Sequence, residues 1–206
     1  MYVPSAFAEE RLDVLHGFIA THDFATLVTG AGGEMVASHL PVLLLPARGR
    51  CGTLQVHLAR QNAQWRELAA GWPALVIFQG PHGYVSPRWY ANPVSVPTWN
   101  YVVVHAQGTP RQMEEAALRE HLTALVAKYE PREGGWDAAA LPGAVMEKLL
   151  QQIVGFDIEM TSIQGKWKLG QNRTREDREG AIEGLRQTGD GEGIVLADWM
   201  AATLRT

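Results

Sequence analysis

The feature that most constrains this chain is a series of β-rich runs joined by short turns, with few helices between them. Gly30-Ala31-Gly32-Gly33 joins the first two runs and predicts a β-hairpin. Because strands and helices do not alternate one for one, a doubly wound parallel sheet is disfavoured. At least six strands linked in this way predict a small antiparallel barrel. The runs are Phe24–Thr29, Met35–Leu45, Thr53–Leu58, Ala74–Phe78, Thr98–Gln107 and Val154–Ile163.

Apolar residues at helical spacing lie outside these runs. Thr174, with Asp177 three residues later, suits the N-cap of a helix that starts at Arg175. Residues 189–193 contain three glycines but follow a helix, so a linker is expected rather than a dinucleotide-binding loop. The expected fold class is therefore α+β, mainly antiparallel β, with peripheral helices. The spacing predicts helices over residues 8–21, 62–70, 112–129, 143–152 and 175–187, with a short terminal helix after them.

Length and charge limit the class of protein. The 206 residues suit one domain with an appendage, which we expect over residues 1–172 and 173–206. A formal net charge of −4 supplies no general attraction for nucleic acid. The single cysteine, Cys51, makes no internal disulfide. With no signal-peptide pattern and no apolar run near the ~20 residues of a membrane helix, we expect a cytoplasmic protein without a membrane segment.

Several common catalytic patterns are absent from the sequence. It has no P-loop motif and no Gly-x-Ser-x-Gly motif. The seven histidines never occur as His-x-x-x-His or His-x-His, so no metal site is expected. No dedicated acid–base pair stands out, so no catalytic residue is assigned and the question of enzymatic activity stays open.

Two segments concentrate polar and aromatic residues. In His57-Leu58-Ala59-Arg60-Gln61-Asn62 a strand ends and a helix begins, which suits an anion site or an ordinary helix cap with an exposed arginine. Ser86–Tyr90 and Pro97–Tyr101 hold four large aromatic side chains. Such a segment suits a flat aromatic ligand or a subunit interface. The residues alone leave both pairs of alternatives open.

Ordered motifs make the chain resemble the PaiB family. The resemblance spans about residues 1–186. It implies the FMN-binding split β-barrel shared with pyridoxamine-phosphate oxidases and flavin reductases, a homodimer with flavin at the interface, and a negative transcriptional regulator. The motifs are Met1-Tyr2-x-Pro4-x-x-Phe7, His57-Leu58-Ala59-Arg60-x-Asn62, Phe78-Gln79-Gly80-Pro81-His82-x-Tyr84-x-Ser86-Pro87-x-Trp89-Tyr90, Val96-Pro97-Thr98-Trp99-Asn100-Tyr101 and Lys166-Trp167-Lys168-Leu169-x-Gln171-Asn172.

The resemblance and the chemistry of FMN together indicate a set of cofactor-binding residues. Arg60 and Lys168 are the expected cations for the phosphate, because charge-assisted hydrogen bonds are the strong ones. We expect both side chains to be solvated when no ligand is bound. The strand at Ser38–His39 is expected to offer backbone groups to the ring edge, and three aromatic side chains a wall, with core packing an open alternative for Trp99. The whole set is Ser38, His39, His57, Arg60, Asn62, Ser86, Trp89, Trp99, Asn100, Tyr101, Lys168 and Gln171.

The sequence departs from the family pattern at two places. Gln61-Asn62-Ala63 stands in place of Ala-Asn-Pro, and Gly170 in place of a serine whose hydroxyl would bond the phosphate or cap a helix. The main alternative is a flavin-dependent oxidoreductase acting on a small molecule, in which the flavin carries the chemistry. Haem binding is a third alternative with less support, because no histidine is singled out as an axial ligand. The segment Lys166–Arg178 has a local net charge of +3, which suits a solvated helix start or DNA contact.

Overall fold

The structure is a computed structural model that describes residues 1–31, 33–91, 94–131, 133–137 and 140–205. In this part of the chain one sheet has the hydrogen-bonded order β3-β2-β6-β7-β8-β5-β4, and β1 pairs with β8. The pairs with a defined register are all antiparallel, and the order is an open path from β3 to β4. The predicted mainly antiparallel class is confirmed. The strands are β1 (Ala8–Glu9), β2 (Phe24–Ala31), β3 (Glu34–Pro41), β4 (Leu43–Leu45), β5 (Thr53–Ala59), β6 (Ala74–Val85), β7 (Thr98–Gln112) and β8 (Ile153–Lys168).

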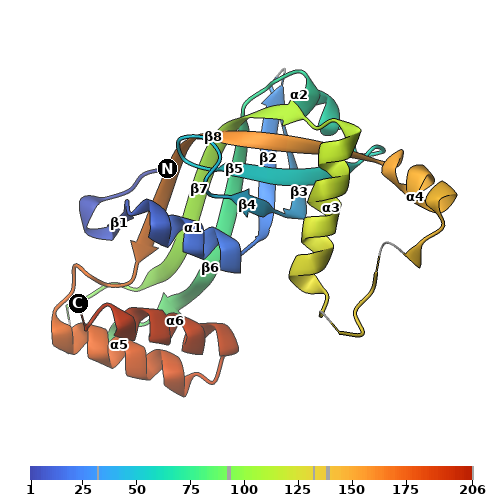
Figure 1. Cartoon of the computed structure of the whole chain (residues 1–206). Helices are drawn as coiled ribbons and strands as arrows, with labels where there is room; N and C mark the ends of the chain where they lie inside the picture. Colours follow the sequence, from blue (N-terminus) through green and yellow to red (C-terminus); the bar gives the residue numbers. More distant parts are fainter. Residues whose placement is uncertain (32, 92–93, 132, 138–139, 206) are drawn as a thin grey trace. The chain divides into compact units, whose positions relative to one another are not determined.

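Helices stand between and after the strands (Figure 1). The predicted helix over residues 175–187 is confirmed, and Thr174 caps it by accepting a hydrogen bond from the backbone N–H of Asp177 at 3.3 Å. The hairpin of β2 and β3 is also confirmed, although Gly32 of its predicted turn lies outside the described residues. The helices are η1 (Ser5–Phe7), α1 (Leu12–Thr21), α2 (Trp65–Ala69), η2 (Pro87–Trp89), α3 (Glu115–Tyr129), α4 (Gly143–Leu150), α5 (Arg175–Gln187) and α6 (Gly191–Ala202).

Three predicted boundaries are wrong for identifiable reasons. The first helix starts at Leu12 rather than residue 8, because Ala8 and Glu9 pair with β8 instead. The helix predicted from residue 112 starts at Glu115, because β7 continues to Gln112. The last helix starts inside the predicted linker, where the Asp190 carboxylate accepts hydrogen bonds from two N–H groups of its first turn.

The contacts divide the chain into two compact units. The first unit consists of Met1–Leu15, Gln79–His105 and Gln164–Thr206, and the second of His16–Phe78 and Ala106–Ile163. Strands β6, β7 and β8 each contribute residues to both. Helices α5 and α6 belong to the first unit, and the predicted boundary at residue 172 stays a prediction.

In the second unit, α3 packs on the sheet close to β8. Gly155 of β8 permits this, because a Cβ atom there would lie 2.8 Å from both Leu118 Cδ1 and Met113 Sδ. Val56, Phe156 and Ile158 alternate along β5 and β8 with the residues that face the helix, and their side chains are completely buried. Burial of each such side chain stabilises the fold by about 1.5–3 kcal/mol.

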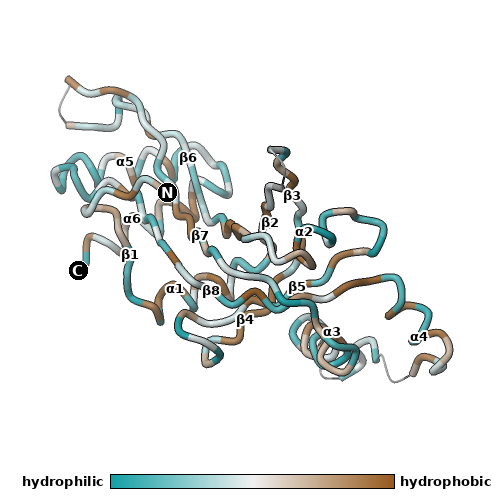
Figure 2. The backbone as a smooth tube through the Cα atoms, turned by 90° about the horizontal axis from the view of Figure 1, so that it is seen from above, coloured by the Kyte–Doolittle hydropathy of each residue, from teal (hydrophilic) through white to brown (hydrophobic). Residues whose placement is uncertain are grey.

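In the first unit, α5 and α6 pack against each other and lie side by side (Figure 1). Leu185, Leu196 and Met200 are among the buried side chains of this pair. Trp89 of η2 rests on Gly184 of α5, where a Cβ atom would lie 2.2 Å from the indole ring. Figure 2 colours much of α5 as hydrophilic, whereas β6 and β7 carry hydrophobic stretches. Among the described residues, no helix has both the length and the apolar character needed to cross a membrane.

Candidate functional site

The predicted cofactor residues are divided between the two units. Five belong to the second unit and seven to the first. The second unit holds Ser38, His39, His57, Arg60 and Asn62, and the first holds Ser86, Trp89, Trp99, Asn100, Tyr101, Lys168 and Gln171.

Ser38 and Asn62 are brought together in the second unit. The Asn62 amide donates to Ser38 Oγ at 2.8 Å, and its oxygen accepts from the backbone N–H of Gln64 at 3.1 Å. Gln64 is 2% exposed, and no partner for its Oε1 occurs among the described residues. Sequence reasoning missed this glutamine, because nothing in the spacing distinguishes a buried glutamine from an exposed one. Its amide N–H groups face the Leu27 carbonyl, the Thr29 hydroxyl and the Val36 carbonyl at 3.1–3.2 Å.

The two predicted histidines have separate partners. His39 is exposed, and its Nδ1 lies 3.0 Å from Thr26 Oγ1. His57 on β5 is half-buried, and its Nδ1 lies 3.1 Å from Nε2 of the fully buried His121 on α3. Burial lowers the pKa of His57, and burial together with the neighbouring His57 lowers the pKa of His121 to about 4. Both rings are therefore neutral at pH 7.

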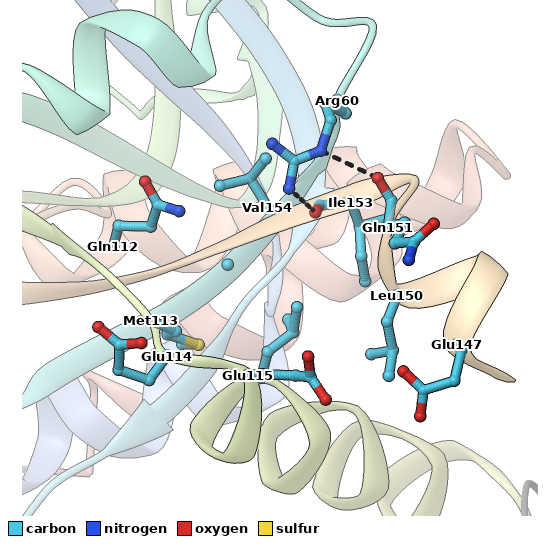
Figure 3. Close-up of a pocket in the computed structure, with 12 residues that line it drawn as sticks. Arg60, Gln112, Met113, Glu114, Glu115, Glu147, Leu150, Gln151, Ile153 and Val154 are labelled. Atoms are coloured by element: carbon cyan, nitrogen blue, oxygen red, sulfur yellow. Dashed lines mark hydrogen bonds between the residues drawn. The ribbon is translucent and has the colours of Figure 1, made fainter. Parts of the chain in front are cut away.

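Arg60 follows β5 and is held by the backbone of the segment that begins β8. Its Nε donates to the Gln151 carbonyl at 2.9 Å and its Nη2 to the Ile153 carbonyl at 3.2 Å (Figure 3). The guanidinium also lies 5.7 Å from the centre of the Trp65 ring. Arg60 is exposed, as expected of a solvated side chain, but these contacts hold its guanidinium in place.

The pocket beside Arg60 is acidic. It has a volume of about 240 Å³, and the carboxylates of Glu114, Glu115 and Glu147 line it (Figure 3). Arg119 pairs with two of them, Glu115 at 2.8 Å and Glu147 at 2.5 Å. Three carboxylates around two guanidinium groups repel a phosphate dianion more than they attract it.

Lys168, at the end of β8, has the opposite surroundings. Its Nζ donates to Thr98 Oγ1 at 2.5 Å and to the Trp99 carbonyl at 2.6 Å, and lies 6.0 Å from the centre of the Tyr101 ring. Lys168 is half-buried, so the expectation of a solvated Lys168 is wrong. Burial, and then repulsion by Lys166 and Arg173, lower its pKa. In the described part of the chain no carboxylate forms an ion pair with it.

An exposed aromatic cluster lies in the same unit. The Trp99 side chain is 54% exposed, which excludes the alternative that it packs in the core. The His82 ring stacks beside it and the Tyr84 ring meets it edge-on, each with its centre 6.2 Å away. Tyr101, two residues on, is half-buried next to Lys166 and Lys168. This cluster offers a flat ligand an aromatic surface beside cations.

The other predicted residues of the first unit make internal contacts. Ser86 caps η2 by accepting from the N–H of Arg88 at 3.3 Å. Asn100 is 2% exposed and donates to Met200 Sδ at 3.4 Å. Trp89 packs on α5 as described above. None of these contacts tests a role toward a cofactor, so those roles stay predictions.

The late motif forms a tight turn. Gln171 accepts from the N–H of Leu169 at 2.8 Å and donates to the Trp167 carbonyl at 2.6 Å. Gly170 between them has a φ of +84°, a left-handed conformation that strains a serine. The glycine at this position thus has a backbone reason independent of any hydroxyl.

The groups present fit FMN. A phosphate dianion placed near Lys168 relieves the repulsion among three cations, and the exposed Trp99 suits the flat ring. When bound, FMN supplies the redox chemistry, and the protein supplies binding and orientation.

Comparison with known proteins agrees with this fit. The family described as "Putative FMN-binding domain" matches residues 1–162. The "Protease synthase and sporulation protein PAI 2" of Bacillus subtilis (strain 168) is 36% identical over 208 residues, covering 100% of this chain and 99% of that protein.

Two solved structures share the fold. The FAD and haem binding protein of Mycobacterium smegmatis has a TM-score of 0.59 at 23% identity, covering 77% of this chain and 71% of that one. The flavocytochrome Anf3 of Azotobacter vinelandii has a TM-score of 0.61 at 14% identity, covering 84% of this chain and 75% of that one. The split-barrel fold class and FMN as the cofactor are thus confirmed, and the chain belongs to the PaiB family of FMN-binding proteins.

Proposed function

We propose that this protein is a PaiB-type negative transcriptional regulator that binds FMN on the exposed aromatic cluster of its first unit. The observation that carries the proposal is the exposed Trp99 ring beside Lys168, an ammonium group without a carboxylate partner among the described residues. In this proposal the ring of FMN lies against Trp99 and Tyr101, and Lys168 takes the phosphate. The remaining predicted residues, Ser38, His39, His57, Arg60, Asn62, Ser86, Trp89, Asn100 and Gln171, stay candidates for lesser contacts.

The cofactor part is tested with a pair of tryptophan variants. Trp99→Ala removes the exposed ring of the cluster, while Trp72→Ala removes another exposed ring, 47% accessible, in the second unit. Each purified variant is mixed with excess FMN and passed over gel filtration. We expect flavin to comigrate with the wild type and Trp72→Ala, but to be largely lost from Trp99→Ala. Equal retention by all three would remove Trp99 from the site.

A homodimer is the second part of the proposal, with the segment of residues 86–101 at or near the interface. Its support is the density of exposed aromatic and aliphatic side chains there, including Val96 at 69% and Trp99 at 54% exposure. Light scattering at micromolar concentration should give twice the chain mass of 22.6 kDa. A mass of one chain would contradict this part and leave the FMN part standing.

The regulatory part is supported by the name of the Bacillus subtilis relative, which refers to protease synthesis and sporulation. The cations of the segment 166–178 are partly engaged within the protein. Arg175 pairs with Glu179 at 2.8 Å, Arg173 lies 4.6 Å from the Tyr90 ring, and Lys166 is 8% exposed. Direct DNA contact by this segment therefore has less support than indirect regulation.

The salt dependence of DNA binding distinguishes direct DNA contact from indirect regulation. If the segment binds DNA, affinity falls steeply with salt, because each neutralised phosphate releases counterions. Charge reversal at Arg173 and Arg175 should then abolish binding in a variant whose circular dichroism is unchanged. Absent or salt-insensitive binding, together with turnover of reduced nicotinamide by the FMN-loaded protein, would favour the oxidoreductase alternative. The cytoplasmic location stays a prediction.

A further inference from the structure

An apolar pocket lies between α3 and α4 in the second unit, two helices that stand next to each other in Figure 1. Its volume is about 630 Å³. Apolar side chains form its walls from three segments of the chain. They are Leu122 and Val126 of α3, Trp136 and Leu141 of the connecting segment, and Met146 and Leu149 of α4.

Large apolar side chains are unusually exposed around this pocket. Trp136 is 52% exposed and Leu149 is 50% exposed, and both line it. A second cavity of about 310 Å³ shares Leu122, Val126 and Trp136 with it, and so extends it along α3. Apolar groups gathered in a concave site, rather than scattered singly, are typical of a ligand-binding site.

The two charged side chains that line the pocket pair with each other. Arg119 and Glu147, which both line the pocket, form an ion pair at 2.5 Å that joins α3 to α4. The extension along α3 adds the carboxylate of Glu130 and the His57 ring, whose pKa is lowered by burial. Among the described residues that line it, the pocket therefore offers no unpaired cation to an anionic ligand, and a neutral ligand fits it best.

The volume of the pocket indicates the size of the ligand. A cavity of about 150 Å³ holds one benzene molecule, so a site of 630 Å³ has room for roughly four such rings. Because the walls come from two helices and the segment that joins them, the site is a bounded pocket rather than an open trough for a long chain segment.

We propose that the pocket between α3 and α4 binds a neutral, mainly apolar small molecule of two to four rings, at a site separate from the FMN site. The pocket lies wholly within the second unit, whereas Trp99 and Lys168 belong to the first. The proposal does not depend on FMN binding.

Two probes with the same skeleton test the charge preference. N-phenyl-1-naphthylamine is neutral, and 8-anilinonaphthalene-1-sulfonate carries one added sulfonate. Equilibrium dialysis against the full-length, FMN-loaded protein should give one site per chain for the neutral probe and at least tenfold weaker binding of the sulfonate. Equal or tighter binding of the sulfonate, or no saturable binding of the neutral probe, would overturn the proposal.

Matched variants locate the site. Val126→Trp fills the junction of the two cavities, whereas Ala127→Trp adds the same side chain at the neighbouring exposed position of α3. We expect at least a tenfold loss of neutral-probe binding in the first variant and no loss in the second. If Val126→Trp does not fold, Leu149→Ala and its exposed control Val145→Ala on α4 make the same comparison at lower structural cost.

Two further readouts distinguish other outcomes. FMN affinity should be the same in Val126→Trp and the wild type, so loss of neutral-probe binding with unchanged FMN affinity supports a separate site. A change of oligomeric state in Val126→Trp, measured by light scattering, would show that a second copy of the chain covers the pocket. That result, or probe binding unaffected by every variant, would contradict the proposal.

Discussion

The two units treat their candidate phosphate-binding cations in opposite ways. In the first unit, burial and then repulsion by Lys166 and Arg173 lower the pKa of Lys168, and no carboxylate pairs with it in the described residues. Arg60 in the second unit is fixed to two backbone carbonyls and borders a pocket with three carboxylates. A phosphate dianion therefore lowers the electrostatic energy of the first cluster and raises that of the second.

The difference extends to groups buried in each unit. The first unit places the Lys166 amine between the rings of Tyr2 and Tyr101, at 5.5 and 5.2 Å from their centres. The second unit buries His57 and His121 as neutral rings that share a hydrogen bond. The first unit thus gathers cations around Lys168, whereas the second keeps its two buried histidines uncharged. An arginine or lysine in a motif therefore does not by itself identify an anion site.

Acidification gives the largest expected effect and tests the neutral state of the second unit. The folded state holds the pKa of His121 at about 4, below its ordinary value of 6.5, so the unfolded chain binds this proton at higher pH. The resulting stability is present above pH 6.5 and is lost as the pH falls from there toward 4, by up to roughly 3 kcal/mol.

The check is urea unfolding between pH 4.5 and 7.5. His121→Gln keeps a hydrogen-bonding side chain but does not titrate, so its stability should depend less on pH than that of the wild type. Parallel curves for the two proteins would show that folding does not lower the pKa of His121, and the contrast between the units would then be lost.

Gly184→Ala tests whether the aromatic segment of the first unit is anchored by α5. The added Cβ would lie 2.2 Å from the Trp89 ring, so we expect a loss of about 2 kcal/mol in the free energy of unfolding, although alanine favours helix. Gly191→Ala, on α6 with open space around its Cα, is the control and should not destabilise. If both variants are equally stable, Trp89 is free to move and the anchoring account is wrong.

Arg60→Ala should give the smallest change in stability. It removes two hydrogen bonds to backbone carbonyls from an exposed side chain, which we expect to cost about 1 kcal/mol. Arg66→Ala is the matched control, because Arg66 also lies over the Trp65 ring, at 5.2 Å, and is exposed. Denaturant unfolding of the two variants should differ by about the value of those bonds. No difference would mean that Arg60 is free to serve a ligand.

The sequence predicts most of the sheet because its strands alternate and end at turns. The prediction of strand ends fails where contacts between distant parts of the chain determine where a strand stops. The strand predicted over Thr98–Gln107 continues to Gln112 in β7. Gly108 lies within it, where a Cβ atom would lie 2.3 Å from the Glu159 carbonyl oxygen. That contact depends on a residue about fifty positions away and is invisible to local patterns.

The proposed site rests on the sequence to a similar extent. The aromatic motif predicts Trp99 and Tyr101 as its residues, and the late motif predicts Lys168, because rings and cations are what FMN requires. The acidic pocket beside Arg60 was not predictable, since its carboxylates come from residues flanking or within α3 and α4. The inward position of Asn100 likewise depends on Met200 of α6.

The most direct test of the account compares FMN with riboflavin, which lacks the phosphate, in Lys168→Ala and Arg60→Ala. We predict that Lys168→Ala weakens FMN binding about ten- to hundredfold, equivalent to about 1.5–3 kcal/mol, and leaves riboflavin binding nearly unchanged. Lys168→Arg should keep most of the FMN affinity of the wild type. Arg60→Ala should lose less FMN affinity than Lys168→Ala. Equal loss of both flavins in Lys168→Ala, or the larger FMN loss in Arg60→Ala, would contradict the assignment of the phosphate to the first unit.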